Sequence, residues 1–261
     1  MMTPLVVITR PQAQAEPLLR ALDEAGIRTV HQPTLRILPV ADPDGLCRYL
    51  ENRCGEYGLA LFVSINAVQQ AAQLVDLARW LQGKQVFAVG HATRSWLQRQ
   101  GVESVHAPRS RQTSEGLLAL SELQHPAGNG VERRAILFNA AGGRQLLLDT
   151  LTERGFRVEE AQVYRRQPET GLRPELRQAL IQRQPLLLTA TSSAMLDALL
   201  NLCSPEWRDH LLDQTLIVVS PRMAHHAHSL GFNRVFQAQG ASNEQLMEAI
   251  KRQQDHKFTS P

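Results

Sequence analysis

Four short segments of this chain share one local pattern, in which a glycine directly precedes an apolar residue and a valine-containing stretch follows. The pattern occurs at Gly26-Ile27, Gly101-Val102, Gly155-Phe156 and Gly231-Phe232. Glycine accepts the left-handed conformation that often ends a helix, and the apolar residue after it can pack back against that helix. Each segment therefore predicts a joint between a helix and a strand. Helices and strands that alternate in this way form parallel sheets with helices on both faces.

The stretch from residue 135 to residue 168 shows one such alternation in full. Ala135 to Phe138 is a short apolar run typical of a buried strand, and Asn139 to Gly143 form a turn of small residues. From Arg144 onward, leucines recur at helical spacing, and a second strand then ends near Tyr164. A helix start of this kind presents backbone N–H groups that bind anions. Ligands of open α/β sheets bind at the carboxyl ends of strands, where we expect Tyr164 to lie.

A chain of 261 residues, 43% of them hydrophobic and 20% charged, has the length and the apolar content for two domains. Extended segments marked by prolines, at residues 33–40 and 160–168, are candidates for the passages between the domains. We therefore predict an α/β protein of two doubly wound parallel-sheet domains. The first and last parts of the chain form one domain and the middle part forms the other, with the ligand in the cleft between them.

Charge and cysteine content exclude several classes of protein. The net charge is +3 and the basic residues are spread along the chain, which argues against a nucleic-acid partner. The cysteines number three and have no C-x-x-C spacing, which argues against a disulfide framework and a zinc site. The apolar run near the N-terminus is too short for a signal peptide, and no run approaches the length of a membrane span. We expect a cytoplasmic protein with no membrane partner.

Small polar residues follow most of the predicted strands. They form the turns Thr9-Arg10, Ser64-Ile65-Asn66, Gly90 to Thr93, Thr113-Ser114, Gly142 to Arg144, Ser192-Ser193 and Ser220 to Arg222. Any one of these turns, taken singly, is explained by helix capping. Taken together at the edges of the sheets, they predict a surface of backbone N–H donors for a ligand with several carboxylates or phosphates.

Familiar catalytic motifs are absent from the sequence. It contains no G-x-S-x-G, no G-x-x-x-x-G-K-[ST] and no H-E-x-x-H. The turn at Ala140 to Gly143 lacks the G-x-G-x-x-G spacing of dinucleotide-binding proteins. Among His225, His226 and His228, only the first and last share a helical face, and no nearby Cys or carboxylate completes a metal site, so surface histidines are favoured.

Tyr164 is the candidate acid. Its hydroxyl could give a proton to a leaving group bound at the strand ends. The alternative is an aromatic side chain that packs against the crossing strands with its hydroxyl in water. The residues alone leave both interpretations open.

The polar turns, in their order along the chain, resemble those of the uroporphyrinogen-III synthase family, and the likeness runs nearly from end to end. The segments that carry it are V-I-T-R-P (Val7 to Pro11), F-V-S-I-N-A-V (Phe62 to Val68), A-V-G-H-A-T (Ala88 to Thr93), T-S-E-G-L-L (Thr113 to Leu118), G-G-R with the later R-G-F-R-V, Tyr164, V-V-S-P-R (Val218 to Arg222) and G-A-S (Gly240 to Ser242). Each motif is weak by itself, whereas their order and spacing together are specific.

This resemblance implies two flavodoxin-like domains joined by a two-stranded connector. Its implied bounds are residues 1–36 with 169–255, and residues 37–168, with 256–261 as a flexible tail. It implies no metal and no cofactor. The implied substrate is the linear tetrapyrrole hydroxymethylbilane, which the family cyclises with inversion of the terminal ring and loss of water, through a spirocyclic intermediate. Tyr164 matches the family tyrosine proposed to assist the loss of the hydroxyl group.

The turns and the resemblance together predict substrate contacts from Arg10, Ser64, Asn66, Ala67, Gly90, Thr93, Ser114, Gly142, Gly143, Arg144, Ser192, Ser193, Ser220 and Arg222. The sequence departs from the family at one turn, because Asn139 and Ala140 replace an arginine and a glycine that the family often has. A cationic contact is therefore missing there. The arginines of the set keep their places, but they could instead hold the loops through hydrogen bonds to carbonyl groups.

The sequence leaves a second function open, that of a non-catalytic two-domain protein that binds a polycarboxylate small molecule by hinge closure. Such a carrier has no evident need for Tyr164 at the crossing strand, which favours the enzyme. A response-regulator-like module is disfavoured because acidic residues do not cluster at the strand ends. We expect a monomer that makes at most a transient contact with the preceding enzyme of the pathway.

Overall fold

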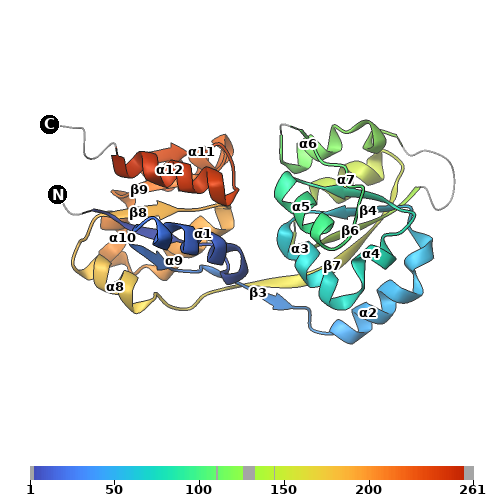
Figure 1. Ribbon diagram of the computed structural model, residues 1–261, viewed down its shortest axis with the longest axis horizontal. Helices are drawn as coiled ribbons and strands as arrows, with labels where there is room; N and C mark the ends of the chain where they lie inside the picture. The colour runs from blue at the N-terminus through green and yellow to red at the C-terminus, as the bar shows by residue number, and fades with distance from the viewer. Residues whose placement is uncertain (1–2, 110, 126–132, 144, 256–261) are drawn as a thin grey trace. The chain divides into compact units, whose positions relative to one another are not determined.

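The computed structural model of the chain describes residues 3–109, 111–125, 133–143 and 145–255. The chain divides into two compact units (Figure 1). Unit 1 is Met1–Arg36 together with Gln167–Pro261, and unit 2 is Ile37–Arg166. The predicted fold class, two α/β domains of which the first is discontinuous, is confirmed. The predicted tail at 256–261 lies outside the described residues.

Unit 1 is built on a sheet with the strand order β10-β9-β8-β1-β2, in which the strands pair in parallel. Its strands are β1 (Leu5–Ile8), β2 (Thr29–His31), β8 (Leu186–Thr189), β9 (Thr215–Val218) and β10 (Arg234–Gln237). Its helices are α1 (Gln12–Glu24), α8 (Pro174–Ile181), α9 (Ser193–Leu202), α10 (Pro205–Leu212), α11 (Pro221–Ser229) and α12 (Asn243–Asp255).

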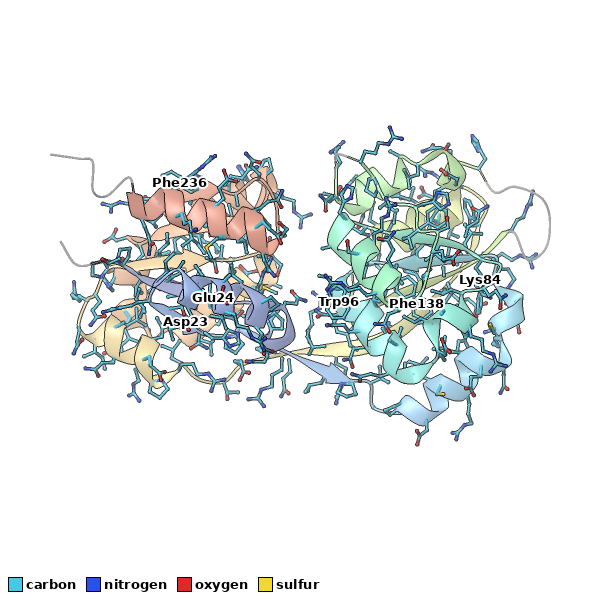
Figure 2. All side chains as sticks on the ribbon, viewed as in Figure 1. Asp23, Glu24, Lys84, Trp96, Phe138 and Phe236 are labelled. Carbon is cyan, nitrogen blue, oxygen red and sulfur yellow. The ribbon has the colours of Figure 1, made fainter. Side chains whose placement is uncertain are left out.

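Helices cover both faces of this sheet. Buried leucine and isoleucine side chains of α1 and α12 pack on one face, and those of α8, α9 and α10 pack on the other together with α11. Counted along the chain within unit 1, the strands lie in the order 5-4-3-1-2, which is the doubly wound flavodoxin-like arrangement. The edge strand β10 is less buried, and its Phe236 is 45% exposed (Figure 2).

Unit 2 is built on a second sheet, with the strand order β3-β7-β6-β4-β5. Its strands are β3 (Leu35–Pro39), β4 (Leu59–Phe62), β5 (Gln85–Ala88), β6 (Arg134–Ala140) and β7 (Arg157–Pro168). Its helices are α2 (Pro43–Asn52), α3 (Ile65–Leu74), α4 (Leu77–Trp80), α5 (His91–Arg99), α6 (Ser114–Leu118) and α7 (Leu146–Glu153), with short 3-10 helices η1 (Cys54–Glu56) and η2 (Ser121–Leu123).

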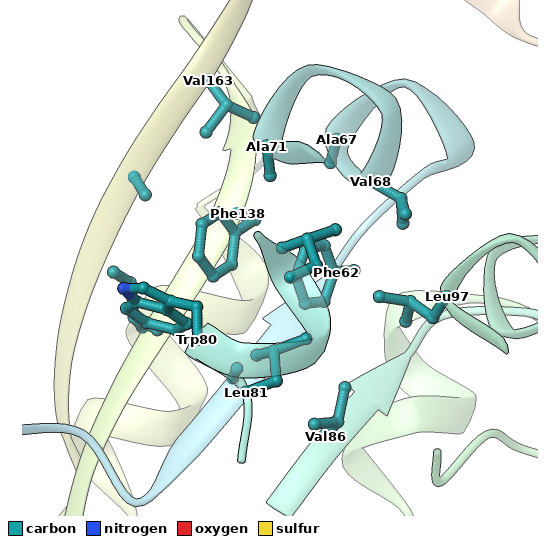
Figure 3. Close-up of a cluster of buried hydrophobic side chains, with 14 of the residues drawn as sticks. Phe62, Ala67, Val68, Ala71, Trp80, Leu81, Val86, Leu97, Phe138 and Val163 are labelled. Atoms are coloured by element: carbon teal, nitrogen blue, oxygen red, sulfur yellow. The ribbon is translucent and has the colours of Figure 1, made fainter. Parts of the chain in front are cut away.

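Stacked aromatic rings form the centre of the unit 2 core on the face that α3 covers (Figure 3). The rings of Phe62 on β4 and Phe138 on β6 have centroids 4.5 Å apart and planes within 2° of each other. Trp80 of α4 meets Phe138 edge to face, with centroids 5.6 Å apart. Buried alanines of α3 let that helix approach the rings. The opposite face of the sheet packs against α6 and α7.

The chain passes between the units through β3 and β7, which are neighbours in one sheet. The Glu169 N–H donates to the carbonyl of Thr34 at 3.0 Å, and Arg165 Nε donates to the carbonyl of Pro39 at 3.1 Å. These hydrogen bonds show that residues 34–39 and residues 165–169 run side by side and antiparallel. They form the two-stranded connector that the resemblance implied.

The glycine joints have the conformation that the sequence predicts. Gly26, Gly101, Gly155 and Gly231 have φ angles of +68°, +83°, +92° and +101°. At each joint, the N–H of the apolar residue after the glycine donates to the carbonyl five residues earlier, at 2.9 to 3.1 Å. This is the hydrogen bond of a Schellman motif, and it explains why glycine ends these four helices.

A charged cluster surrounds Glu159, near the amino end of β7. Tyr49 and Tyr57 donate their hydroxyls to the Glu159 carboxylate at 2.5 and 2.9 Å, and Arg53 and Arg134 approach it to 2.6 and 2.8 Å. Burial by itself would raise the pKa of this carboxyl, but the hydrogen bonds outweigh it and lower the pKa to about 2. The cluster thereby ties α2, β6 and β7 together.

We predict that Glu159→Gln, which removes the charge and keeps the shape, lowers the free energy of unfolding by about 1–2 kcal/mol at neutral pH, because hydrogen bonds to a charged acceptor are stronger. Since the folded-state pKa is depressed, the stabilisation is complete above the ordinary value of 4.5 and is lost as the pH falls toward about 2. Urea unfolding of both proteins at neutral pH and inside this window measures the change.

The exposed pair of Glu16 and Arg20 in α1 supplies the matched control. Glu16→Gln should change the unfolding free energy by less than about 0.5 kcal/mol, because solvent screens an exposed ion pair. A deficit of Glu159→Gln that stays the same from neutral to acidic pH would contradict the role given to the Glu159 charge.

Candidate active site

Parallel pairing brings the turns after the strands to one edge of each sheet. In unit 2 the strand order reverses between β4 and β6, and doubly wound proteins bind ligands at the carboxyl ends of the strands where this happens. The turns after β4, β5 and β6 lie at the same edge as the later part of β7. This edge carries the predicted residues Ser64, Asn66, Ala67, Gly90, Thr93, Gly142, Gly143 and Tyr164.

Tyr164 and Ser64 contact each other at this edge. Tyr164 Oη lies 3.1 Å from Ser64 Oγ. Ser64 is the N-cap of α3, and its Oγ also accepts the N–H of Ala67 at 3.2 Å. Tyr164 is only 3% exposed. Its ring packs in the core of unit 2, while its hydroxyl is held by another side chain rather than left to water.

A β-bulge turns Tyr164 toward α3. Successive residues of a strand point to opposite faces of the sheet, yet Val163 and Tyr164 are both buried in the same hydrophobic cluster. The register of β6 against β7 shifts between Asn139 and Ala140, so that Ala140 pairs with Tyr164 and one residue of β7 is skipped. Bulges next to ligand sites re-aim side chains in this way. No local pattern in the sequence predicts this bulge.

The turn after β6 uses its donors within the protein. The Ala141 N–H donates to the carbonyl of Tyr164 at 3.0 Å, and the Gly143 N–H donates to the carbonyl of Ala140 at 3.0 Å. Gly142 has a φ of +65°, which favours glycine there. This turn therefore has fewer N–H groups left for an anion than the sequence suggests.

Asn139 stands beside the same turn. Its Nδ2 donates to Glu160 Oε1 at 2.5 Å, and its Oδ1 is buried without a hydrogen-bond partner among the described residues. The contact with Glu160 was not anticipated from the sequence. The following helix, α7, begins at Leu146 rather than at Arg144, and Arg144 itself lies outside the described residues.

A side chain of the protein covers the turn after β5. Gln112 Oε1 accepts the first N–H of α5, that of His91, at 3.0 Å. Gly90 leaves room for it, since a Cβ there would lie 2.9 Å from the same oxygen. The predicted turn is shorter than expected because α5 begins at His91, so Thr93 lies inside the helix and is buried. Ser114 is the first residue of α6.

Unit 1 has turns of the same kind, where its strand order reverses between β1 and β8. Ser192 and Ser220 are the N-caps of α9 and α11, and each Oγ accepts the N–H of the third residue beyond it at 3.3 Å. Ser193 is the first residue of α9, and Arg222 is exposed in the first turn of α11. Both serines thus cap helices, as predicted for single turns.

Arg10 follows β1 and is buried. Burial lowers the pKa of its guanidinium to about 10. Its Nη1 donates to Asn243 Oδ1 at 2.9 Å, and its Nη2 donates to the carbonyl of Ala241. Its Nε is buried and has no hydrogen-bond partner in the described part of the chain. Arg10 therefore holds the loop before α12, which is the alternative that the sequence left open for the arginines.

One histidine of α11 pairs with a carboxylate from another helix. His226 Nε2 lies 2.7 Å from Asp197 Oδ1 on α9. His228 Nδ1 lies 2.9 Å from the carbonyl of Phe232. Within residues 3–109, 111–125, 133–143 and 145–255, no three His, Cys, Asp or Glu side chains are grouped so that they could hold a metal ion. No helix in these ranges is long and apolar enough to cross a membrane.

Comparisons with known proteins agree with this architecture. The family model described as uroporphyrinogen-III synthase HemD matches residues 16–248. The uroporphyrinogen-III synthase of Escherichia coli is 32% identical over 249 residues, covering 94% of this chain and 99% of the relative. That of Salmonella typhimurium is 34% identical over 255 residues, covering 94% and 99%.

Two solved structures resemble the fold of this chain. A mutant uroporphyrinogen III synthase from Thermus thermophilus is 20% identical, with a TM-score of 0.64, and the match covers 97% of this chain and 99% of that one. The uroporphyrinogen-III synthetase of Helicobacter pylori is 16% identical, with a TM-score of 0.59, and the match covers 97% and 100%.

We predict that Arg10→Lys lowers the free energy of unfolding by about 1–2 kcal/mol, because one ammonium cannot reproduce the forked hydrogen bonds of a buried guanidinium. Amide hydrogen exchange should accelerate at Ala241, in the loop before α12, and at Asn243, the first residue of that helix. Arg222→Lys is the control, since that arginine is exposed and its replacement should leave the thermal midpoint unchanged. Equal stability of Arg10→Lys and the parent would show that the loop does not depend on the guanidinium.

Proposed function

The chain belongs to the uroporphyrinogen-III synthase family, and we propose that it closes hydroxymethylbilane to uroporphyrinogen III with inversion of the terminal ring and loss of water. The observation that best supports a chemical role for its own residues is the position of Tyr164, a buried residue whose hydroxyl lies 3.1 Å from Ser64 Oγ at the carboxyl edge of the unit 2 sheet. The protein is then a lyase of porphyrin biosynthesis.

The proposed reaction transfers protons and involves no net oxidation or reduction. The C–O bond of the hydroxymethyl group breaks, and its electron pair leaves on the oxygen. Tyr164 gives its proton to that oxygen, so that water departs, while the pyrrole nitrogen lone pair stabilises the carbon left behind. A carbon–carbon bond forms between that carbon and the substituted α carbon of the terminal pyrrole, which gives the spirocyclic intermediate. The older bond from this α carbon to its bridging carbon then breaks, and the bridging carbon bonds instead to the free α carbon of the same pyrrole, so that the terminal ring is inverted. The proton released from that free α carbon returns to the tyrosine. Groups that donate and accept protons are sufficient for these steps, and we propose that no cofactor takes part.

Positioning is the second part of the proposal. Hydroxymethylbilane closes unaided to the isomer without inversion, so the enzyme has to hold one conformation of the chain of pyrroles. We propose that the acetate and propionate carboxylates are bound at the helix starts of α3 in unit 2 and of α9 and α11 in unit 1, where N–H groups and the helix dipole favour anions. Exposed Arg222 adds a cation to the α11 start.

Several expectations from the sequence stay predictions. We predict that the substrate lies between the domains and that the protein is a cytoplasmic monomer that makes a transient contact with the preceding enzyme. The individual substrate contacts expected from Asn66, Ala67, Gly90, Thr93 and the other turn residues stay predictions too.

We predict that the purified protein, supplied with porphobilinogen and its deaminase, yields mostly the isomer III porphyrin after oxidation. Chromatographic separation of the porphyrin isomers measures this. The control omits the protein and should give isomer I, the product of unaided closure. Isomer I in both samples would refute the proposed activity, and tight binding of the product without control over the isomer would favour a carrier.

We predict that Tyr164→Phe lowers kcat for isomer III by roughly 10²-fold, the range expected when a proton donor is lost. The ring remains in the core, so the thermal midpoint should change little. The same isomer assay, run at several substrate concentrations, measures the loss. Full turnover by the variant would remove the tyrosine from the chemistry while leaving the family activity in place.

A further inference from the structure

We infer that Ser64 serves the reaction as a positioning residue for Tyr164: its hydroxyl donates to Tyr164 Oη and leaves the phenol proton free for the departing oxygen. This inference rests on the proposed cyclisation, and it goes further because it replaces a direct contact between Ser64 and the substrate with an action through the tyrosine. The contact that carries it is the 3.1 Å distance between Ser64 Oγ and Tyr164 Oη.

The hydrogen-bonding capacity of Ser64 allows two arrangements. A serine hydroxyl has one proton to donate and two lone pairs that accept. The Ala67 N–H takes one lone pair of Ser64 Oγ at 3.2 Å. Tyr164 can then donate to the second lone pair, which ties up the phenol proton, or accept the serine proton, which leaves the phenol proton available.

The position of Ser64 at a helix start favours the second arrangement as the reaction proceeds. Its Oγ accepts an N–H at the positive end of α3, and this polarises its own O–H toward donation. When Tyr164 loses its proton, the oxygen that remains is negative and can only accept. The serine proton then stabilises it through a charge-assisted hydrogen bond. In the first arrangement this stabilisation would require both protons to move.

Backbone pairing fixes both partners. The carbonyl of Tyr164 accepts the Ala141 N–H at 3.0 Å, and the bulge holds its ring on the α3 side of the sheet. The carbonyl of Ser64 accepts the Val68 N–H at 3.3 Å, in the first turn of α3. Tyr164 belongs to β7 and Ser64 caps α3, so backbone hydrogen bonds hold both residues that carry the hydroxyls, which is what a precise contact needs.

The test compares Ser64→Gly, Ser64→Thr, Tyr164→Phe and the double variant Ser64→Gly with Tyr164→Phe in the isomer III assay. Glycine is a tolerated N-cap, so the first variant removes the hydroxyl with little loss of helix stability. We expect Ser64→Gly to lower kcat about tenfold, the value of a hydrogen bond to a developing charge, with KM unchanged. Ser64→Thr should retain most of the parent kcat.

The double variant separates an action through the tyrosine from any other role. If Ser64 acts through Tyr164, Ser64→Gly should cause no further loss in kcat once the phenol is absent. Asp42→Ala is the control for cap loss alone, because it removes the Oδ1 that accepts the Gly45 N–H at 2.8 Å at the start of α2. It should leave kcat and KM at parent values.

Three results would overturn the inference while the parent still forms isomer III. These are a raised KM at unchanged kcat in Ser64→Gly, losses that multiply in the double variant, and full turnover by Tyr164→Phe. The first would make Ser64 a substrate contact. A parent protein that leaves only isomer I would instead refute the proposed function, and the inference with it.

Discussion

Parallel pairing of short buried strands is the constraint on which the rest of this structure depends. Each of the strands β1, β4, β8 and β9 has four residues, and all of them are buried. Each sheet therefore requires helices on both of its faces. A parallel neighbour can be reached only through a crossover that returns the chain to its starting edge. The crossovers after β1, β4, β5, β8 and β9 each begin with a polar turn and a helix start at the carboxyl edge of the sheet. The candidate site of unit 2 lies along that edge.

The long strand β7 joins the stability of unit 2 to its chemistry. It runs over 12 residues, with the Glu159 cluster near its amino end and Tyr164 toward its carboxyl end. Arg53, Arg134, Tyr49 and Tyr57 hold the amino end of β7 through Glu159. Pairing with β6 continues from there to the bulge, which turns the Tyr164 side chain toward α3. The proposed acid is therefore held by the sheet itself, which suits a reaction in which a wrong geometry yields the wrong isomer.

The polar turns also accommodate side chains of the protein itself, which the sequence alone did not predict. The sequence presents glycines and hydroxyls as a surface open to an anionic ligand. In the structure, Gly90 makes room for Gln112, and Gly240 makes room for Gln245, whose Oε1 accepts the Ser242 N–H at 3.2 Å. Arg10 likewise holds a loop through neutral acceptors. Glycine in such a turn can serve the packing of the protein's own amide side chains, and composition cannot tell this use from ligand binding.

The strand that the sequence predicts to end near Tyr164 continues as β7 to Pro168. The sequence by itself determined the alternation of strands and helices, the four glycine joints and the discontinuous two-domain class. These depend on backbone preferences and apolar periodicity within a few residues, which a local pattern records. The tertiary structure alone decided which face Tyr164 presents, that Ser64 is its partner 100 residues away, and that Asp197 lies beside His226. Such contacts depend on strand register, on one skipped residue in β7 and on helix packing, and no single stretch of the chain encodes them.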